Sequence, residues 1–509
     1  MRKLTLALAA VVLVGLPTHA ARAFCGFYVS GADGSLYANA TMVVLMREGT
    51  RTVLSMQNNY QGPPQDFAMV IPVPVVLQQE NVKTLPREIF QRVDSLAAPR
   101  LVEYWEQDPC QPPIDYLRMP MAAPSAAMEG AAPRSDERLG VRVEAQFTVG
   151  EYDIVILSAS DSNGLDTWLR RERYNIPRGA EAVLRPYVAQ GTKFFVAKVD
   201  VERVTFRNGQ AVLSPLRFHY DTPEFSLPVR LGLLNSAGTQ DLIVHVLAPN
   251  QRYEVANYAN TTIPTNLRVS NEVRTRFGAF YEALFARTVE SHPRTVVTEY
   301  SWDSSSCDPC PVDPLNPGEV ETLGGDVIPS VQPYGLTLTR LHYRYGRDDL
   351  GEDLVFRAAP PIVGGRGVPD TNGKIPQEVQ QDGYNNFQGR YVILHPWEGA
   401  ISCSEPRRGI WGGPIGGSEP RALAASNGAL SGAAPRAVSH LESFLVDPVP
   451  ELAVTRPEAP EPTPHARTRR HGCASCAVGA DEPDLAGPSL AALSILAVAL
   501  GRTLRRRGR

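Results

Sequence analysis

The chain has 509 residues, of which 43% are hydrophobic and 20% are charged, and its formal net charge is −4. These proportions are those of folded globular protein, and the length suits one large domain with insertions or more than one domain. Eight positive charges lie in the predicted leader and the arginine-rich tail described below, so residues 24–501 carry −12. An acidic body of this kind repels phosphate backbones, and we expect no nucleic-acid partner.

The N-terminus has the order of parts of an export signal. Arg2 and Lys3 precede an apolar run from Leu4 to Leu16, and Ala23 ends a small-residue cleavage site. This order is typical of a secretory signal peptide, and the run is shorter than the roughly 20 residues of a spanning helix. We therefore predict a signal peptide that ends at residue 23, with the secretion machinery as a partner.

Two β-type segments follow the leader. Residues 36–60 alternate apolar and polar side chains around Gly49, which predicts a β-hairpin. Residues 62–77 form an apolar run that contains Pro72 and Pro74. Because proline lacks a backbone N–H, we expect this run at a sheet edge or as separate short strands, and not as a central strand.

A helix is predicted between Pro86 and Pro99, because apolar residues recur there at helical intervals. Residues 119–139 are rich in alanine, proline and serine and show no apolar period. That composition is typical of a flexible surface loop.

Strand-like runs outnumber helical ones in the rest of the predicted folded body. Helices are predicted at 162–176, 179–190 and 271–289. The strand-like runs are 143–159, 192–206, 213–235, 240–249, 334–346, 352–365 and 387–403. Because adjacent strands look joined by hairpins, the pattern favours an α+β fold with largely antiparallel sheets over a doubly wound sheet.

The folded body, predicted to span residues 24–413, holds an odd number of cysteines: Cys25, Cys110, Cys307, Cys310 and Cys403. Export would place these five disulfide candidates where disulfides form and persist. An odd number allows at most two internal bridges, and spacing does not determine the connectivity.

Cys307 and Cys310 have the C-x-x-C spacing, which three kinds of site use. A redox centre would need a helix start and a βαβ pattern, whereas prolines crowd this segment. Zinc would need a second ligand pair, and the obvious pair lies in the tail. A structural disulfide that closes a proline-rich loop is the interpretation we favour, and a thiol–disulfide enzyme is the rival hypothesis.

Other candidate chemistry has weaker support. Four histidines lie inside strand-like runs, where we expect polar residues on exposed sheet faces: His219, His245, His342 and His395.

Four acidic residues could bind calcium, but a solvated acidic turn is the expected structure: Asp348, Asp349, Glu352 and Asp353. At the start of the helix 162–176, Asp161 and Asn163 resemble a calcium loop, but an N-cap by Asp161, Ser162 or Asn163 explains them better. No common catalytic motif is present, so we assign no catalytic residue, cofactor or metal; a hydrolase built from distant residues stays an alternative.

After residue 413 the composition changes. Residues 414–472 are rich in proline and glycine, and we expect a stalk that buries no core. An apolar run at about 485–501 would give a short transmembrane helix, and the arginines behind it, which include Arg505, Arg506 and Arg507, predict a cytoplasmic end.

Residues 473–509 contain, in this order, Cys473 and Cys476, a short spacer, the apolar run and the arginine cluster. With this order of parts the tail resembles the myxobacterial-type C-terminal sorting signal. The resemblance implies that a sorting peptidase processes the tail, that one of the two cysteines is a processing or lipid-attachment residue, and that the protein is membrane-anchored and displayed at the cell surface.

Several stretches stand out between about Phe24 and Gly413: FCGFYV, YQGPPQDFAMVIPVP, YDIVILSA followed by GLDTWL, CDPCP, and NNFQGRYVILHPW. Through these stretches the body resembles the bacterial family catalogued as domain of unknown function 2330. The resemblance implies export and anchoring and brings no catalytic residues. We therefore expect a surface-anchored α+β protein that serves as a non-catalytic binding or structural component of the envelope.

Overall fold

Most of the predicted strands and helices form in the computed structural model, which describes residues 27–29, 41–57, 68–110 and, with short gaps, 140–455. The gaps are residues 173, 175, 177–178, 208–209, 236–238, 309, 329–333, 347–348, 415–422 and 425–439. The predicted leader, Cys25, the loop 119–139 and all of the predicted sorting signal lie outside the described residues. Within the described part of the chain, no helix is both long and apolar enough to cross a membrane.

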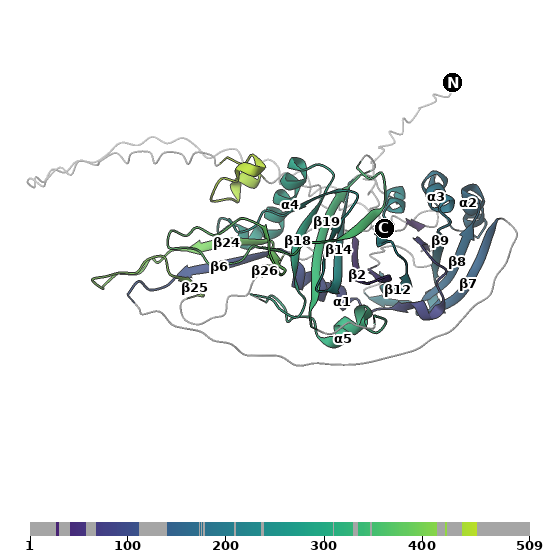
Figure 1. Ribbon diagram of the computed structural model, residues 1–509, viewed down its shortest axis with the longest axis horizontal. Helices are drawn as coiled ribbons and strands as arrows, with labels where there is room; N and C mark the ends of the chain where they lie inside the picture. The colour runs from purple at the N-terminus through teal and green to yellow at the C-terminus, as the bar shows by residue number, and fades with distance from the viewer. Residues whose placement is uncertain are drawn as a thin grey trace, which may run out of the picture. The chain divides into compact units, whose positions relative to one another are not determined.

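The largest sheet has 11 strands in the described residues, in the order β22-β21-β23-β18-β19-β14-β2-β3-β12-β5, with β16 beside β18 (Figure 1). Its strands are β2 Thr41–Glu48, β3 Arg51–Met56, β5 Val82–Thr84, β12 Leu216–Asp221, β14 Gln240–Pro249, β16 Ala259–Thr262, β18 Thr295–Asp303, β19 Leu336–Tyr345, β21 Ile362–Gly364, β22 Gln380–Gln381 and β23 Asn386–Gln388. Most neighbours are antiparallel, but β2 and β14 pair in parallel at the centre. Nearly every residue of these two strands is buried, so other elements cover both faces of the sheet there.

The predicted hairpin around Gly49 is confirmed. β2 and β3 pair antiparallel from Val43 opposite Met56 to Glu48 opposite Arg51. Gly49 lies in the turn with φ +54°. Glycine enters this left-handed region without the steric cost that a Cβ atom would bring.

A second sheet has five strands in the order β1-β4-β9-β8-β7, namely β1 Phe27–Val29, β4 Ala68–Val73, β9 Lys193–Val199, β8 Tyr152–Ala159 and β7 Val141–Val149. Of the two alternatives predicted for residues 62–77, the sheet edge is wrong for β4, which is a short strand that lies between β1 and β9. The reason is local, because β1 pairs only with residues 68–70. Pro72 lies opposite Phe194 of β9 and faces no other described strand, so its missing N–H breaks no ladder.

The helices predicted from apolar periodicity all form: α1 Glu88–Ala97, α2 Ser162–Arg171, α3 Ala180–Ala189 and α4 Val273–Ser291. The short α5, Pro317–Val320, was not predicted. Asp161 caps α2, because its carboxylate accepts a hydrogen bond of 2.6 Å from the backbone N–H of Gly164. The N-cap interpretation of Asp161 is therefore confirmed.

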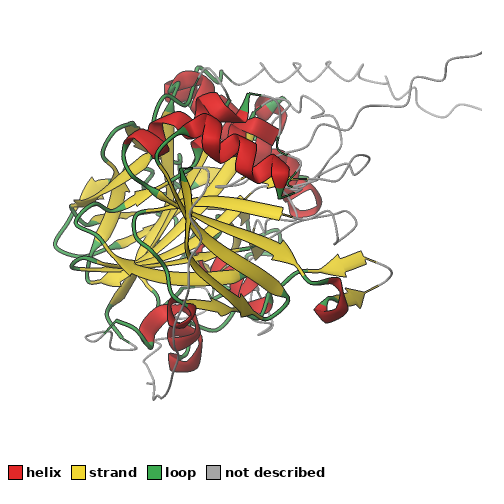
Figure 2. Cartoon of the chain, turned by 90° about the vertical axis from the view of Figure 1, so that its right-hand side faces the viewer, coloured by secondary structure: helices red, strands yellow, loops and turns green. Residues whose placement is uncertain are grey.

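Apolar packing arranges these elements in four layers. One hydrophobic cluster joins the facing sides of the two large sheets, with Leu45 and Ile154 among its members. A second fills the space between the five-stranded sheet and α2 and α3. Two further clusters lie on the other side of the 11-stranded sheet, one beneath α1 and one beneath α4. Strands predominate over helices (Figure 2), and the α+β prediction is confirmed, with mixed sheets.

Smaller elements complete the described chain. A sheet in the order β17-β24-β6-β25, with β26 beside β6, consists of β17 Leu267–Arg268, β24 Arg390–His395, β6 Arg100–Glu106, β25 Trp411–Gly412 and β26 Leu423–Ala424. The remaining strands are β13 Ser226–Leu227, β20 Leu354–Ala359, β15 Arg252–Val255, β10 Thr205–Arg207 and β11 Gln210–Val212. Short helical turns are η2 Gln79–Asn81, η3 Val201–Arg203, η4 Arg230–Asn235, the π-helical η5 Glu321–Gly325, η6 Leu441–Ser443 and η7 Pro450–Leu452.

Residues 440–455, which lie inside the predicted stalk, pack on the folded body. We call these residues the strap. Six of its apolar side chains are buried in the cluster beneath α4, together with Phe280 and Tyr391. The backbone N–H of Ser270 donates to the carbonyl of Phe444 at 2.8 Å. A few spaced apolar residues in a proline-rich sequence therefore suffice to dock on a hydrophobic face that is already formed.

Candidate functional site

The central strands carry polar side chains into the layer between the 11-stranded sheet and the helices α1 and α4. Arg340, His342 and Arg344 alternate along β19, and side chains two residues apart share one face of a strand. On the adjacent β14, Asp241 lies opposite Arg344 and His245 lies opposite Arg340. The register of these two strands therefore places five ionisable groups on the same face.

β18 adds Glu299 through a break in its ladder. The pairing with β19 shifts between Thr298 and Tyr300, which leaves Glu299 as an extra residue. A bulge of this kind redirects a side chain. Glu299 is fully buried and contacts β19 on the face that carries the other charges.

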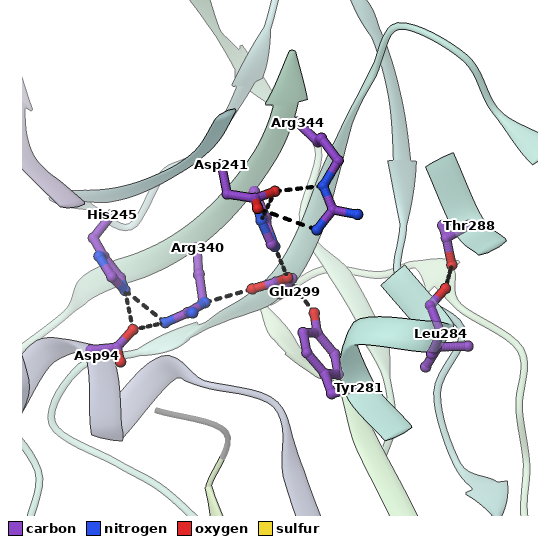
Figure 3. A network of polar contacts seen from close by, with 10 residues as sticks. Asp94, Asp241, His245, Tyr281, Leu284, Thr288, Glu299, Arg340 and Arg344 are labelled. Atoms are coloured by element: carbon purple, nitrogen blue, oxygen red, sulfur yellow. Dashed lines mark hydrogen bonds and ion pairs between the residues drawn. The ribbon is translucent and has the colours of Figure 1, made fainter. Parts of the chain in front are cut away.

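Arg340 lies at the centre of these charged groups (Figure 3). We call them the buried ion network, which consists of Asp94, Asp241, His245, Glu299, Arg340, His342 and Arg344. The Nε of Arg340 donates to Glu299 Oε2 at 2.5 Å, and its Nη1 donates to Asp94 of α1. The same Nη1 lies 3.3 Å from His245 Nε2. Arg340 has no exposed surface, so the sheet and α1 are joined through a charged contact that water does not reach.

His342 lies between two carboxylates. Its Nδ1 is 2.7 Å from Glu299 Oε1, and its Nε2 is 3.2 Å from Asp241 Oδ1. Phe285 of α4 stacks on the imidazole, with ring centroids 3.6 Å apart. The Tyr281 hydroxyl of α4 also donates to Glu299. The network therefore holds α4 as well as α1.

The network balances its charges. Arg340, His342 and Arg344 supply cations, and three carboxylates face them, because Asp241 also accepts from Arg344 Nε at 2.7 Å. Burial alone would raise the pKa of Glu299, but the charges of His342 and Arg340 and its hydrogen bonds outweigh burial and lower this pKa to about 2. Burial would likewise raise the pKa of Asp241, but its contacts with His342 and Arg344 outweigh burial and lower this pKa.

The two buried histidines differ in protonation. Burial lowers the pKa of His342, but Glu299 and Asp241 outweigh it, and the net shift is upward. The carboxylates at both ring nitrogens therefore favour the protonated form of His342. The pKa of His245 is lowered far below its usual value, because burial and the charge of Arg340 both oppose protonation. His245 is neutral.

This arrangement is suited to holding elements together and not to proton-transfer catalysis. Both ring nitrogens of His342 are engaged by carboxylates, so the ring has no free lone pair to act as a general base. Glu299 is saturated by Tyr281, Arg340 and His342. The chemical role that fits is structural, with paired buried charges that fix one arrangement of α1 and α4 on the sheet.

The expectation that the four strand histidines lie on exposed sheet faces is wrong for His245 and His342, which are fully buried. Helices cover that face of the sheet, and paired charges make burial tolerable. His219 and His395 are half-buried. His395 Nε2 lies 2.6 Å from Glu103 Oε2.

The structure pairs four of the candidate cysteines. Cys110 bonds to Cys403, which lies 293 positions further along the chain, and Cys307 bonds to Cys310. The first bridge joins the loop after β6 to the loop after β24. The second closes a tight turn, as in the structural interpretation that we favour. Cys25 and the predicted processing residues Cys473, Cys476, Arg505, Arg506 and Arg507 lie outside the described residues.

The acidic stretch near residue 350 is tied to protein groups. Asp353 Oδ1 accepts hydrogen bonds from the Tyr187 hydroxyl and from two backbone N–H groups, and its Oδ2 pairs with Arg230 at 3.0 Å. Asp349 caps the backbone N–H of Gly346. Within the described residues, no group of three or more histidine, cysteine, aspartate or glutamate side chains is arranged to hold a metal ion.

The family model described as an uncharacterized protein conserved in bacteria, domain of unknown function 2330, matches residues 19–357. The chain belongs to this family. The match ends inside β20, so the later part of the predicted resemblance, which includes β23 and β24, lies beyond it. No curated protein and no solved structure shows significant similarity to the chain.

The sequence interpretation missed the buried ion network. One signal was present, because β19 reads LTLTRLHYRY, with Arg340, His342 and Arg344 at strand spacing inside a long apolar run. Three such residues on one face indicate a shared partner surface. The partners Asp94 and Glu299 come from distant segments, and no spacing along the chain reveals them.

Proposed function

We propose that this protein is exported and anchored at the bacterial cell surface, where its folded body serves as a non-catalytic binding or structural component of the envelope. The observation that carries the proposal is the bridge between Cys110 and Cys403. Disulfides form and persist in oxidising compartments and are rare in the cytosol. The predicted leader and the predicted sorting signal are consistent with the same route.

The buried ion network supports the non-catalytic part of the proposal. Its charged groups pair with one another and are enclosed between sheet and helices. His245 and His342 thus serve the fold, and the hydrolase alternative receives no support from these two histidines.

The rival function, a thiol–disulfide enzyme at Cys307 and Cys310, lacks the local structure that activates a thiol. A helix N-terminus beside the first cysteine lowers the pKa of a catalytic thiol. Here the next helix, α5, begins only at Pro317. Cys307 is half-buried against apolar residues, while Cys310 is the exposed member of the pair.

Export is tested by comparing the full-length chain with a chain that lacks residues 1–23, both expressed in the native host. We expect proteinase K to digest the full-length protein on intact cells and the leaderless protein only after lysis. Alkylation without reductant should modify Cys110 and Cys403 only in the leaderless protein. Full-length protein that stays in the cytosol with reduced thiols would refute the proposal.

Anchoring is tested with a chain that stops at residue 472. We expect this protein in the medium and the full-length protein in the envelope fraction, and equal release of both would contradict anchoring by the tail.

The non-catalytic assignment is tested by an insulin-reduction assay on the purified protein. Reductase activity that the substitution C307S abolishes would establish the thiol–disulfide enzyme instead.

A further inference from the structure

The loop between β18 and α5 carries the bridge between Cys307 and Cys310. Its ends are held together, because the backbone N–H of Leu315 donates to the carbonyl of Ser304 at 3.0 Å. The Ser304 N–H donates to Leu336 of β19 at 2.8 Å. The loop is therefore fixed at its base, and the disulfide constrains its tip.

Asp308 lies inside the four-residue ring that the disulfide closes. Its carboxylate pairs with Arg366 at 2.5 Å, and its carbonyl accepts a second bond from the same guanidinium. Arg366 also lies over the ring of Trp302, with 4.5 Å from the guanidinium carbon to the ring centroid. The tip of the loop thus holds the segment that connects β21 to β22.

Arg366 is one of three arginines near this point. Arg100 and Arg390 are register partners in β6 and β24, and both are almost completely buried. Arg390 Nη2 donates to the carbonyl of Gly367 at 2.6 Å, next to Arg366. Asp308 is the carboxylate whose charge acts on both Arg100 and Arg390 and which pairs directly with Arg366. Its negative charge therefore partly offsets the repulsion among the three cations.

The ion pair is exposed on the Asp308 side, where the side chain keeps 71% of its accessible surface, against 24% for Arg366. Exposed pairs gain little, because water screens them and both side chains lose conformational freedom. The ring restricts the backbone of Asp308 in advance, so less conformational freedom is lost when its carboxylate pairs with Arg366. Without the ring we expect the pair to separate, since the neighbouring arginines favour outward movement of Arg366.

We propose that the bond between Cys307 and Cys310 is a reducible latch that holds Asp308 on Arg366. The latch thereby fixes the segment 365–367 next to Arg100 and Arg390. Cys310 is the exposed member of the four described cysteines, and the other three are half-buried. Attack by a reductant is therefore directed to Cys310 Sγ, since exposed bridges are the labile ones.

The reductant is a dithiol, either an exported dithiol protein or a small molecule of that class. Its thiolate attacks Cys310 Sγ, the bond between the two cysteines breaks, and Cys307 leaves as a thiolate that takes up a proton. The second thiol of the reductant then displaces Cys310 from the mixed disulfide. The reductant ends as a disulfide, and both cysteines end as thiols.

The latch is tested on the purified full-length protein by titration with dithiothreitol under native conditions. Iodoacetamide followed by peptide mass spectrometry reports which cysteines are free, and phenylglyoxal reports the accessibility of each arginine. We expect Cys307 and Cys310 to be alkylated at lower reductant concentration than Cys110 and Cys403. Phenylglyoxal labelling of Arg366 should then rise severalfold, while labelling of Arg357, which pairs with Glu254 elsewhere on the surface, stays constant.

Two substitutions separate the ion pair from the disulfide. In D308N, Arg366 should be labelled severalfold faster while the protein is oxidised, with no further rise on reduction. D313N removes an exposed carboxylate from the same loop and should behave as the wild type. Unchanged labelling of Arg366 after reduction, a full reduction response in D308N, or simultaneous reduction of both bridges would each overturn the latch.

Discussion

Glu299 is the residue on which the buried ion network depends. It joins Arg340, His342 and Tyr281 and is held in place by the bulge in β18. Desolvation of each buried ion costs several kcal/mol, and the attraction of its partners offsets this cost. Removal of one partner therefore leaves uncompensated charge behind.

We predict that E299Q lowers the free energy of unfolding by about 3–5 kcal/mol, because Arg340 and His342 lose their shared carboxylate. Urea unfolding at pH 7 measures the change. E272Q is the matched control, since Glu272 pairs with Arg276 at the exposed start of α4 and should cost less than about 1 kcal/mol. A loss for E299Q no larger than that of E272Q would contradict the role of the network.

The two buried histidines make the free energy of unfolding depend on pH in opposite directions. The pKa of His342 is raised by Glu299 and Asp241 against the opposing effect of burial, so its contribution is complete below about 6.5 and is lost as pH rises through the folded-state pKa. The pKa of His245 is lowered by burial and by Arg340, so its contribution is present above about 6.5 and is lost as pH falls.

Unfolding free energy measured from pH 5 to pH 9 should therefore decline on both sides of neutrality. H342Q should flatten the decline on the alkaline side, and H245Q the decline between pH 6.5 and pH 5. An alkaline decline in H342Q as steep as in the wild type would show that another group controls it.

Among the elements, β4 and the strap differ most from the sequence expectations, and both follow from tertiary contacts. β4 accepts Pro72 inside a sheet because, within the described residues, β1 pairs only with residues 68–70 and Pro72 has its partner in β9. The strap folds because α4 and β17 offer it an apolar face. Phe444 lies edge-on to Phe280 and beneath the guanidinium of Arg276.

We predict that F444A destabilises the protein by about 3–5 kcal/mol, because it empties a fully buried site. F206A should cost less than about 0.5 kcal/mol, since Phe206 is 53% exposed. A chain that stops at residue 439 should unfold at lower urea concentration than one that stops at residue 456. Equal midpoints for these two chains would show that the strap is not part of the folded body.

For the whole molecule, the two disulfides constrain the unfolded chain to different degrees. The bridge between Cys110 and Cys403 closes a loop of nearly 300 residues, because the two positions are 293 apart, while Cys307 and Cys310 are 3 apart. Loop-closure entropy rises with the logarithm of loop length, so the long bridge restricts the unfolded state more.

We predict that the double substitution C110S/C403S lowers the unfolding free energy by up to about 5 kcal/mol and that C307S/C310S lowers it by about 2 kcal/mol. Denaturant unfolding of the oxidised proteins compares them. A larger loss for C307S/C310S would mean that native contacts of the loop, and not chain entropy, dominate.

Local patterns in the sequence determined the elements that depend on neighbours along the chain. The helices α1 to α4, the hairpin at Gly49 and the Asp161 cap follow from periodicity, turn chemistry and hydrogen bonds within a few residues. The α+β class follows from their order.

Tertiary structure alone decided which distant residues meet. Asp94, Asp241, Glu299 and Arg340 come from four elements, and the partner of Cys110 lies 293 positions away. Desolvation and ion pairing act through space and depend on strand order and register, and neither leaves a periodic trace along the chain.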